Sequence, residues 1–91
     1  MGEGDDAAQQ KLFAVTTFEY LADIMDPPSL GVEIRKAADN VGQTNSLQVL
    51  RQVIRDLLEW TRELPPERVA ELEARLARAK APSLARMREG K

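Results

Sequence analysis

The chain has 91 residues and a formal net charge of -2, from 13 Lys and Arg against 15 Asp and Glu. The absence of His and Cys excludes the usual zinc site, a disulfide, a thiol nucleophile and the commonest general base near neutral pH. No apolar run comes close to the roughly 20 residues of a membrane-spanning helix, and the acidic start does not match a secretory signal. We therefore expect a cytoplasmic protein that has no cofactor, binds no metal or small-molecule substrate, and does not act at a membrane.

The first predicted helix covers residues 7–25 and follows an acidic segment, 1–6, whose composition predicts disorder. Its apolar residues, which include Phe18 and Leu21, cover more than one stripe of a helix. Such a helix lies either at the centre of a bundle or at a subunit interface. The helix is expected to end before Pro27-Pro28, because proline disfavours helix in the residue that precedes it.

The second predicted helix is short and covers residues 30–41. Ser29 is a suitable N-cap, because its hydroxyl can accept a hydrogen bond from a free backbone N–H of the first turn. Gly42 is expected to end this helix in a left-handed conformation, which glycine adopts at little cost.

The third predicted helix covers residues 45–64 and carries the strongest pattern in the chain. A Thr, Asn or Ser at 44–46 can cap it. Its apolar positions alternate between spacings of three and four residues, as in a heptad repeat with a single Thr: Leu47, Leu50, Ile54, Leu57, Thr61 and Leu64. Val53, Leu58 and Trp60 widen this stripe on its flanks.

The fourth predicted helix covers residues 66–80 and opens at Pro65-Pro66, since proline is tolerated in a first turn. Leu72 and Leu76 continue the heptad spacing. The last segment, 82–91, is either a short helix or a basic tail.

Together these patterns predict an all-α protein. We expect a small bundle of about four helices in antiparallel hairpins, forming a single helical domain at 7–81 between the acidic tail (1–6) and the basic tail (82–91). We also expect a homodimer that completes the bundle, because the first helix has more apolar surface than a small monomer can hide.

The predicted function is a non-enzymatic protein–protein interaction in an adaptor, assembly or regulatory role. It is either self-association or the docking of a partner's amphipathic helix in an apolar groove. No nucleophile elbow, phosphate loop or catalytic carboxylate pair is visible in the sequence. The candidate partner-binding residues are apolar: Phe18, Leu21, Leu50, Ile54, Leu57, Leu58 and Trp60. The candidate rim residues are polar or basic: Gln48, Arg51, Arg55, Arg62, Arg86 and Arg88.

The alternative is a small DNA-binding transcriptional regulator with a helix-turn-helix at 34–58, whose turn would be 41–43. Gln48, Arg51 and Arg55 would then contact DNA. Two observations weigh against it. The position that a recognition helix should bury is Gln48, and the net charge lacks the basic surplus of most DNA-binding domains.

Overall fold

The computed structural model describes residues 3–25 and 28–89, and all regular secondary structure in this part of the chain is helical. The helices are α1 (Glu3–Ile24), α2 (Pro28–Gln43), α3 (Leu47–Thr61), α4 (Pro66–Arg78) and α5 (Leu84–Glu89). The all-α prediction is therefore confirmed, with four long helices and a short fifth one.

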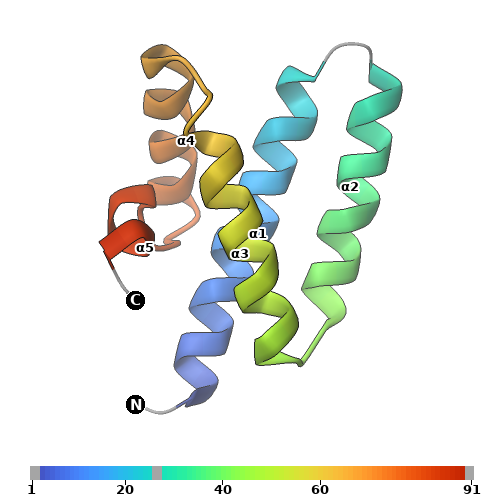
Figure 1. The fold of residues 1–91 in the computed structure, drawn as a ribbon, viewed down its shortest axis with the longest axis vertical. Coiled ribbons are helices and arrows are strands. Elements are labelled where there is room, and N and C mark those ends of the chain that lie inside the picture. Colours follow the sequence, from blue (N-terminus) through green and yellow to red (C-terminus); the bar gives the residue numbers. More distant parts are fainter. Residues whose placement is uncertain (1–2, 26–27, 90–91) are drawn as a thin grey trace.

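Helix α1 lies at the centre of the fold. It packs against α2, α3 and α4, most closely against α2 (Figure 1). Figure 1 shows α2 running antiparallel to α1, with α3 between α2 on one side and α4 and α5 on the other. Of the two positions that its wide apolar surface allowed, α1 takes the central one. Phe13 and Leu21 are fully buried, while Phe18 and Ile24 are half-buried, so the other helices of the chain cover much of the apolar surface of α1. The homodimer stays a prediction.

The close packing of α1 and α2 depends on small residues. A Cβ atom at Gly31 would lie only 2.7 Å from the carbonyl oxygen of Ala22, so no larger residue fits there without moving the backbone. Ala38, two turns further along α2, is buried in the same contact. At these two positions α2 therefore contributes backbone proximity, while Val41, further along the helix, is buried in the core.

The buried face of α3 is the heptad face that the sequence predicted. Leu50, Ile54, Leu57 and Thr61 are buried, and Leu47 is half-buried at the start of the helix. On α4 the buried residues are Leu72 and Leu76, again as the heptad spacing predicts. These side chains meet those of α1 in one hydrophobic core.

The ends of α2 differ from the prediction. Ser29 is not an N-cap, because α2 already begins at Pro28, a residue well suited to a first helical turn. Gly42 does not end the helix, which continues to Gln43; no described glycine has a positive φ. The connection to α3 is 44–46, where the Ser46 hydroxyl accepts a hydrogen bond from the Val49 N–H at 3.3 Å.

The other helix ends follow from local chemistry. Helix α1 begins at Glu3, before the predicted start at residue 7, and residues 1–2 lie outside the described part. Helix α3 stops at Thr61 rather than residue 64, because the next bonds run only three residues back and Pro65 disfavours continuation. Helix α4 ends in a left-handed Lys80 (φ 60°), a position usually taken by glycine.

The C-terminal segment takes the helical one of its two predicted forms. Leu84 of α5 is buried in the core, and its N–H donates a hydrogen bond of 2.8 Å to the Glu73 carboxylate of α4. The Arg88 guanidinium donates to the hydroxyl of Thr61 on α3 at 3.3 Å. Helix α5 thereby joins the end of α3 to the middle of α4.

Candidate functional site

One flank of α3 is apolar but lies outside the core. Val49, Val53 and Trp60 are separated by four and seven residues, a spacing that places them on the same side of a helix. The buried stripe of α3 faces α1, and Thr61, in the last turn of this stripe, is bonded to Arg88 of α5. In Figure 1 α3 runs upward in front of α1 with α2 to its right, so the right-handed turn of the helix places the flank that carries Trp60 on the α2 side.

Helix α2 presents a matching apolar flank. Leu30 and Ile34 lie one turn apart, and Gly31 between them faces α1. On the opposite flank of α2, Arg35 bonds Asp23 of α1, which also bonds Arg75 of α4. Arg35 therefore points to the side of the molecule where α4 lies. Leu30 and Ile34, on the other flank of α2, point toward α3.

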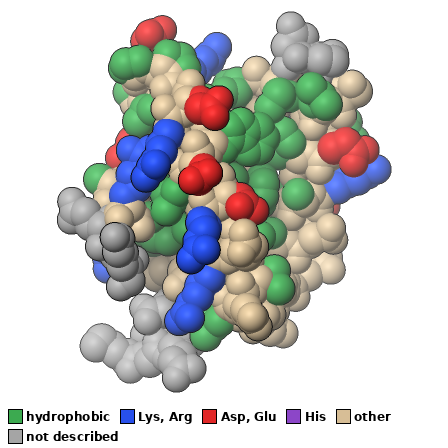
Figure 2. All heavy atoms as spheres, viewed as in Figure 1, with side chains coloured by type: hydrophobic (Ala, Val, Ile, Leu, Met, Phe, Trp, Pro, Cys, Tyr) green, Lys and Arg blue, Asp and Glu red, His purple; other side chains and the backbone are tan. Residues whose placement is uncertain are grey.

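These two flanks, with Phe18 of α1 between them, form what we call the apolar seam: Leu30, Ile34, Val49, Val53, Trp60 and Phe18. Ile34, Val53 and Phe18 are half-buried. Leu30, Val49 and Trp60 remain 48%, 46% and 38% exposed. Leu30 and Trp60 lie toward one end of the apolar seam and Val49 toward the other, because α2 and α3 run in nearly opposite directions (Figure 1). Figure 2 shows hydrophobic side chains gathered between α3 and α2 in the upper half of this face.

Acidic residues border the apolar seam on both helices. Asp56 lies on α3 between Val53 and Trp60 and is exposed, as is Glu63, three residues after Trp60. On α2, Glu33 follows Leu30 by three residues and is paired with Lys36 at 3.8 Å. Figure 2 shows acidic groups along α3 at one edge of the hydrophobic patch, and another acidic group on α2 at its other edge.

The predicted partner-binding residues divide by burial. Four of them form the core of the single chain and have no free surface: Leu21 (1% exposed), Leu50 (0%), Ile54 (7%) and Leu57 (1%). Leu58 is half-buried on the α3 flank opposite Trp60. Only Phe18 and Trp60 belong to the apolar seam.

The predicted rim residues are all exposed: Gln48, Arg51, Arg55, Arg62, Arg86 and Arg88. Arg51, Arg55 and Arg62 share the side of α3 that carries Leu58, away from the apolar seam. Arg88 is held by Thr61. The structure thus places the basic residues of α3 along one edge and the apolar seam along the other.

Sequence reasoning missed Leu30, Ile34, Val49 and Val53 as surface residues. The available signal was a second apolar stripe on α3 at Val49, Val53 and Trp60, beside the heptad stripe. Because α1 covers only one of the two stripes, the other had to stay at the surface or find a partner.

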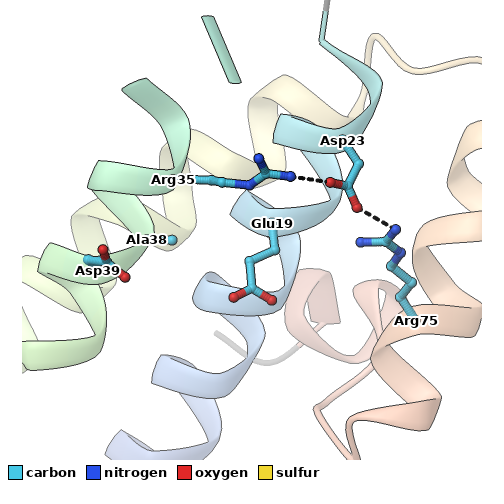
Figure 3. Close-up of a pocket in the computed structure, with 6 residues that line it drawn as sticks. All are labelled: Glu19, Asp23, Arg35, Ala38, Asp39 and Arg75. Carbon is cyan, nitrogen blue, oxygen red and sulfur yellow. Dashed lines mark hydrogen bonds and ion pairs between the residues drawn. The ribbon is translucent and has the colours of Figure 1, made fainter. Parts of the chain in front are cut away.

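A polar pocket of about 350 Å³ lies on the opposite face of α2, lined by Glu19, Asp23, Arg35, Ala38, Asp39 and Arg75 (Figure 3). The two carboxylate oxygens of Asp23 each accept a 2.5 Å hydrogen bond, one from Arg35 and one from Arg75. The Arg75 bond is the main reason why the pKa of Asp23 is lowered; partial burial opposes this shift, and Arg35 adds to it. Both guanidinium groups are thus committed to joining α1, α2 and α4.

A second polar contact joins α4 to α1. The Tyr20 hydroxyl donates a 2.6 Å hydrogen bond to Glu71, which also pairs with Arg68 at 3.1 Å. The Arg75 guanidinium lies 5.2 Å from the centre of the Tyr20 ring, within range of a cation–π interaction. Burial, followed by the bond to Glu71, raises the pKa of Tyr20, while the Tyr20 bond and then Arg68 lower the pKa of Glu71. These groups hold helices α1 and α4 together.

The segment considered for DNA binding has a different geometry from a helix-turn-helix at 34–58. Its turn lies at 44–46, not at 41–43, and α2 and α3 run in nearly opposite directions (Figure 1). A recognition helix instead crosses its neighbour at a steep angle. Gln48, the position that should be buried, is exposed.

Two further properties concern only residues 3–25 and 28–89. None of the helices there is both long enough and apolar enough to cross a membrane. No cluster of three or more acidic side chains in that part is arranged to hold a metal ion.

Comparison of the chain with known protein families, curated proteins and solved structures finds no match.

Proposed function

We propose that this protein is a non-enzymatic interaction module that binds an α-helix of a partner protein along the apolar seam. The observation that carries the proposal is the exposure of Leu30, Val49 and Trp60, at 48%, 46% and 38%, on facing flanks of two helices. An amphipathic helix is commonly recognised through its apolar face, which it lays against an apolar surface of the partner. Here Phe18 of α1 supplies the floor.

Binding of a helix along the apolar seam would be driven by the removal of apolar surface from water, worth about 25 cal/mol for each Å². Trp60 is the strongest candidate anchor, because tryptophan is enriched among the residues that dominate binding energy. A docked helix would extend the bundle beside α2 and α3. Under this proposal the bundle is completed by a partner at the apolar seam, rather than by a second copy covering α1.

DNA binding is the less favoured function. Arg51, Arg55 and Arg62 do form a basic edge on α3, which suits phosphate contacts. Asp56 and Glu63 lie on the same helix or directly after it, however, and the chain carries a net charge of -2. A surface of mixed charge offers little of the counterion release that drives nucleic-acid binding.

Trp60 is the only Trp in the chain, so its fluorescence reports directly on the apolar seam. The probe is a synthetic amphipathic peptide with Leu at i, i+3, i+4 and i+7 and uncharged Gln on its other positions. We expect saturable binding with a shift of Trp60 emission to shorter wavelength. Val49→Ala and Leu30→Ala should each weaken binding about fivefold, the effect of losing about 1 kcal/mol at an interface.

Val32→Ala is the matched control. Val32 is 51% exposed on α2 but does not share the flank of Leu30 and Ile34, so its loss should leave peptide affinity unchanged. The absence of any emission shift at millimolar peptide, or an equal loss in the Val32 variant, would contradict the proposal. Light scattering of the free protein completes the test, since a dimer broken by Val49→Ala would show that a second copy occupies the apolar seam.

A further inference from the structure

We infer that the helix recognised by the apolar seam is basic, with Lys or Arg along both edges of its apolar face. This inference rests on the proposed function and specifies the partner. Its basis is the distribution of charge around the apolar seam, where acidic residues flank the exposed Leu, Val and Trp side chains on both walls.

The acidic groups are placed to meet a docked helix. Asp56 is one turn from both Val53 and Trp60, on the same side of α3. Glu33 occupies the corresponding outer edge of α2, and its side chain is 72% exposed. A helix whose apolar face contacts Trp60 and Leu30 would bring its flanking positions close to these two carboxylates.

The basic residues of the same helices are kept away from the apolar seam. Arg51, Arg55 and Arg62 lie along the far edge of α3, toward α4 and α5. Arg35 is committed to Asp23 on the opposite face of α2. Lys36 is the nearest cation on α2, and its nitrogen lies 3.8 Å from Glu33, at the outer limit of an ion pair. Among the charged residues of α2 and α3, the carboxylates of Glu33 and Asp56 therefore lie nearer to the apolar seam than the guanidinium groups do.

The same distribution disfavours a second copy as the occupant. In a twofold dimer through the apolar seam, both surfaces carry the same acidic border, so the carboxylates of one copy would approach a surface that is itself bordered by carboxylates. Like charges brought together across an interface are destabilising. A basic partner helix instead gains an attractive charge interaction with each carboxylate.

The expected size of the preference is modest. Exposed ion pairs are worth about 0.2–1 kcal/mol each and are screened by salt. Two or three such pairs, with Asp56, Glu33 and Glu63, predict that a basic helix binds roughly tenfold more tightly than an acidic one at low ionic strength. The effect should appear mainly in the association rate, because complementary charge steers encounter.

The test compares three peptides of equal length and helicity that share one Leu face. Their flanking positions are Lys, Gln or Glu, and binding is followed by Trp60 emission at low and high salt. The Lys peptide should bind about tenfold more tightly than the Glu peptide at low salt, and the gap should shrink to about twofold or less in roughly 0.5 M salt. Equal affinities, or tighter binding of the Glu peptide, would overturn the inference while the proposed function survives.

Failure of all three peptides would instead remove the proposed function itself. The position of the charge is tested with the double variant Glu33→Gln, Asp56→Asn, which should lose most of the preference. Its control, Glu19→Gln with Asp39→Asn, changes net charge equally but lies at the pocket on the opposite face of α2. A similar loss in both double variants would show that total charge, not the border of the apolar seam, sets the preference.

Discussion

Helix α3 carries two apolar stripes with the same helical spacing and different surroundings. Leu50, Ile54 and Leu57 are 0%, 7% and 1% exposed, because α1 covers them. Val49 and Trp60 on the neighbouring flank are 46% and 38% exposed, because α2 packs on α1 without covering α3. Both stripes consist of large apolar residues, so residue type does not explain their different exposure. The comparison teaches that the position of a neighbouring helix decides which stripe stabilises the fold and which remains available for binding.

The largest effect that separates the two stripes should be on stability. Leu57→Ala is expected to lower the free energy of unfolding by about 3 kcal/mol, since a buried leucine loses its contacts and leaves a cavity. Val49→Ala should change it by less than about 0.5 kcal/mol, because the side chain is nearly half exposed. Urea unfolding followed by circular dichroism measures both. Similar losses would mean that α3 is rotated relative to α1.

Two buried threonines allow a second comparison within the core, between a hydroxyl with a hydrogen-bond partner and one without. Thr17 of α1 is fully buried, and its hydroxyl has no hydrogen-bond partner among the described residues. Thr61 of α3 is equally buried, but its hydroxyl donates to the Leu58 carbonyl at 2.9 Å and accepts from Arg88. Thr17→Val should raise the free energy of unfolding by about 1 kcal/mol, and Thr61→Val should lower it by a similar amount.

Thermal and urea unfolding of the two valine variants provide the measurement. Each substitution changes shape little, so each serves as the control for the other. A stability loss in both variants would indicate that the Thr17 hydroxyl is satisfied after all.

The smallest expected effect concerns the polar face of α2 that lies opposite the apolar seam. The bond from Arg75 is the chief cause of the lowered pKa of Asp23 in the folded protein. This stabilisation is present above the unfolded pKa of about 3.9 and is lost as pH falls through the folded pKa. Asp23→Asn should therefore flatten the acid end of the stability profile, at a cost below about 1 kcal/mol near pH 7, since the pair is partly exposed.

Unfolding free energies measured between about pH 2 and pH 7 test this sign. Glu19→Gln is the control, because Glu19 lines the same pocket and takes part in neither bond of Asp23. A steeper loss toward acid in the Asp23 variant would contradict the assigned role of Arg75.

Much of the fold could be predicted from local pattern. The helical class and the buried face of α3 followed from apolar spacing, and the break before α4 followed from Pro65-Pro66. The ends of α2 were mispredicted because Gly42 can either cap a helix or lie within one, and the residues after it decide between the two. Ser46 offers α3 an N-cap, so α2 can extend to Gln43.

The candidate site was predicted only in part. Phe18 was selected from the wide apolar surface of the first helix and Trp60 from the flank of the heptad stripe, and both lie on the apolar seam. Leu50, Ile54 and Leu57 were selected as heptad positions and belong to the core. Periodicity finds apolar faces, but it does not say which face another helix of the same chain will cover.

The sequence by itself determined that this chain forms helices, where most of them lie, and which chemistries it lacks, because these depend on residue type and on neighbours within a few turns. Only the tertiary structure decided that α1 is central, that Arg35 and Arg75 share Asp23, and that the apolar seam is bordered by carboxylates. The reason is packing. Gly31 lets α2 approach the backbone of α1 closely, and α2 packs on α1 without covering Trp60 of α3.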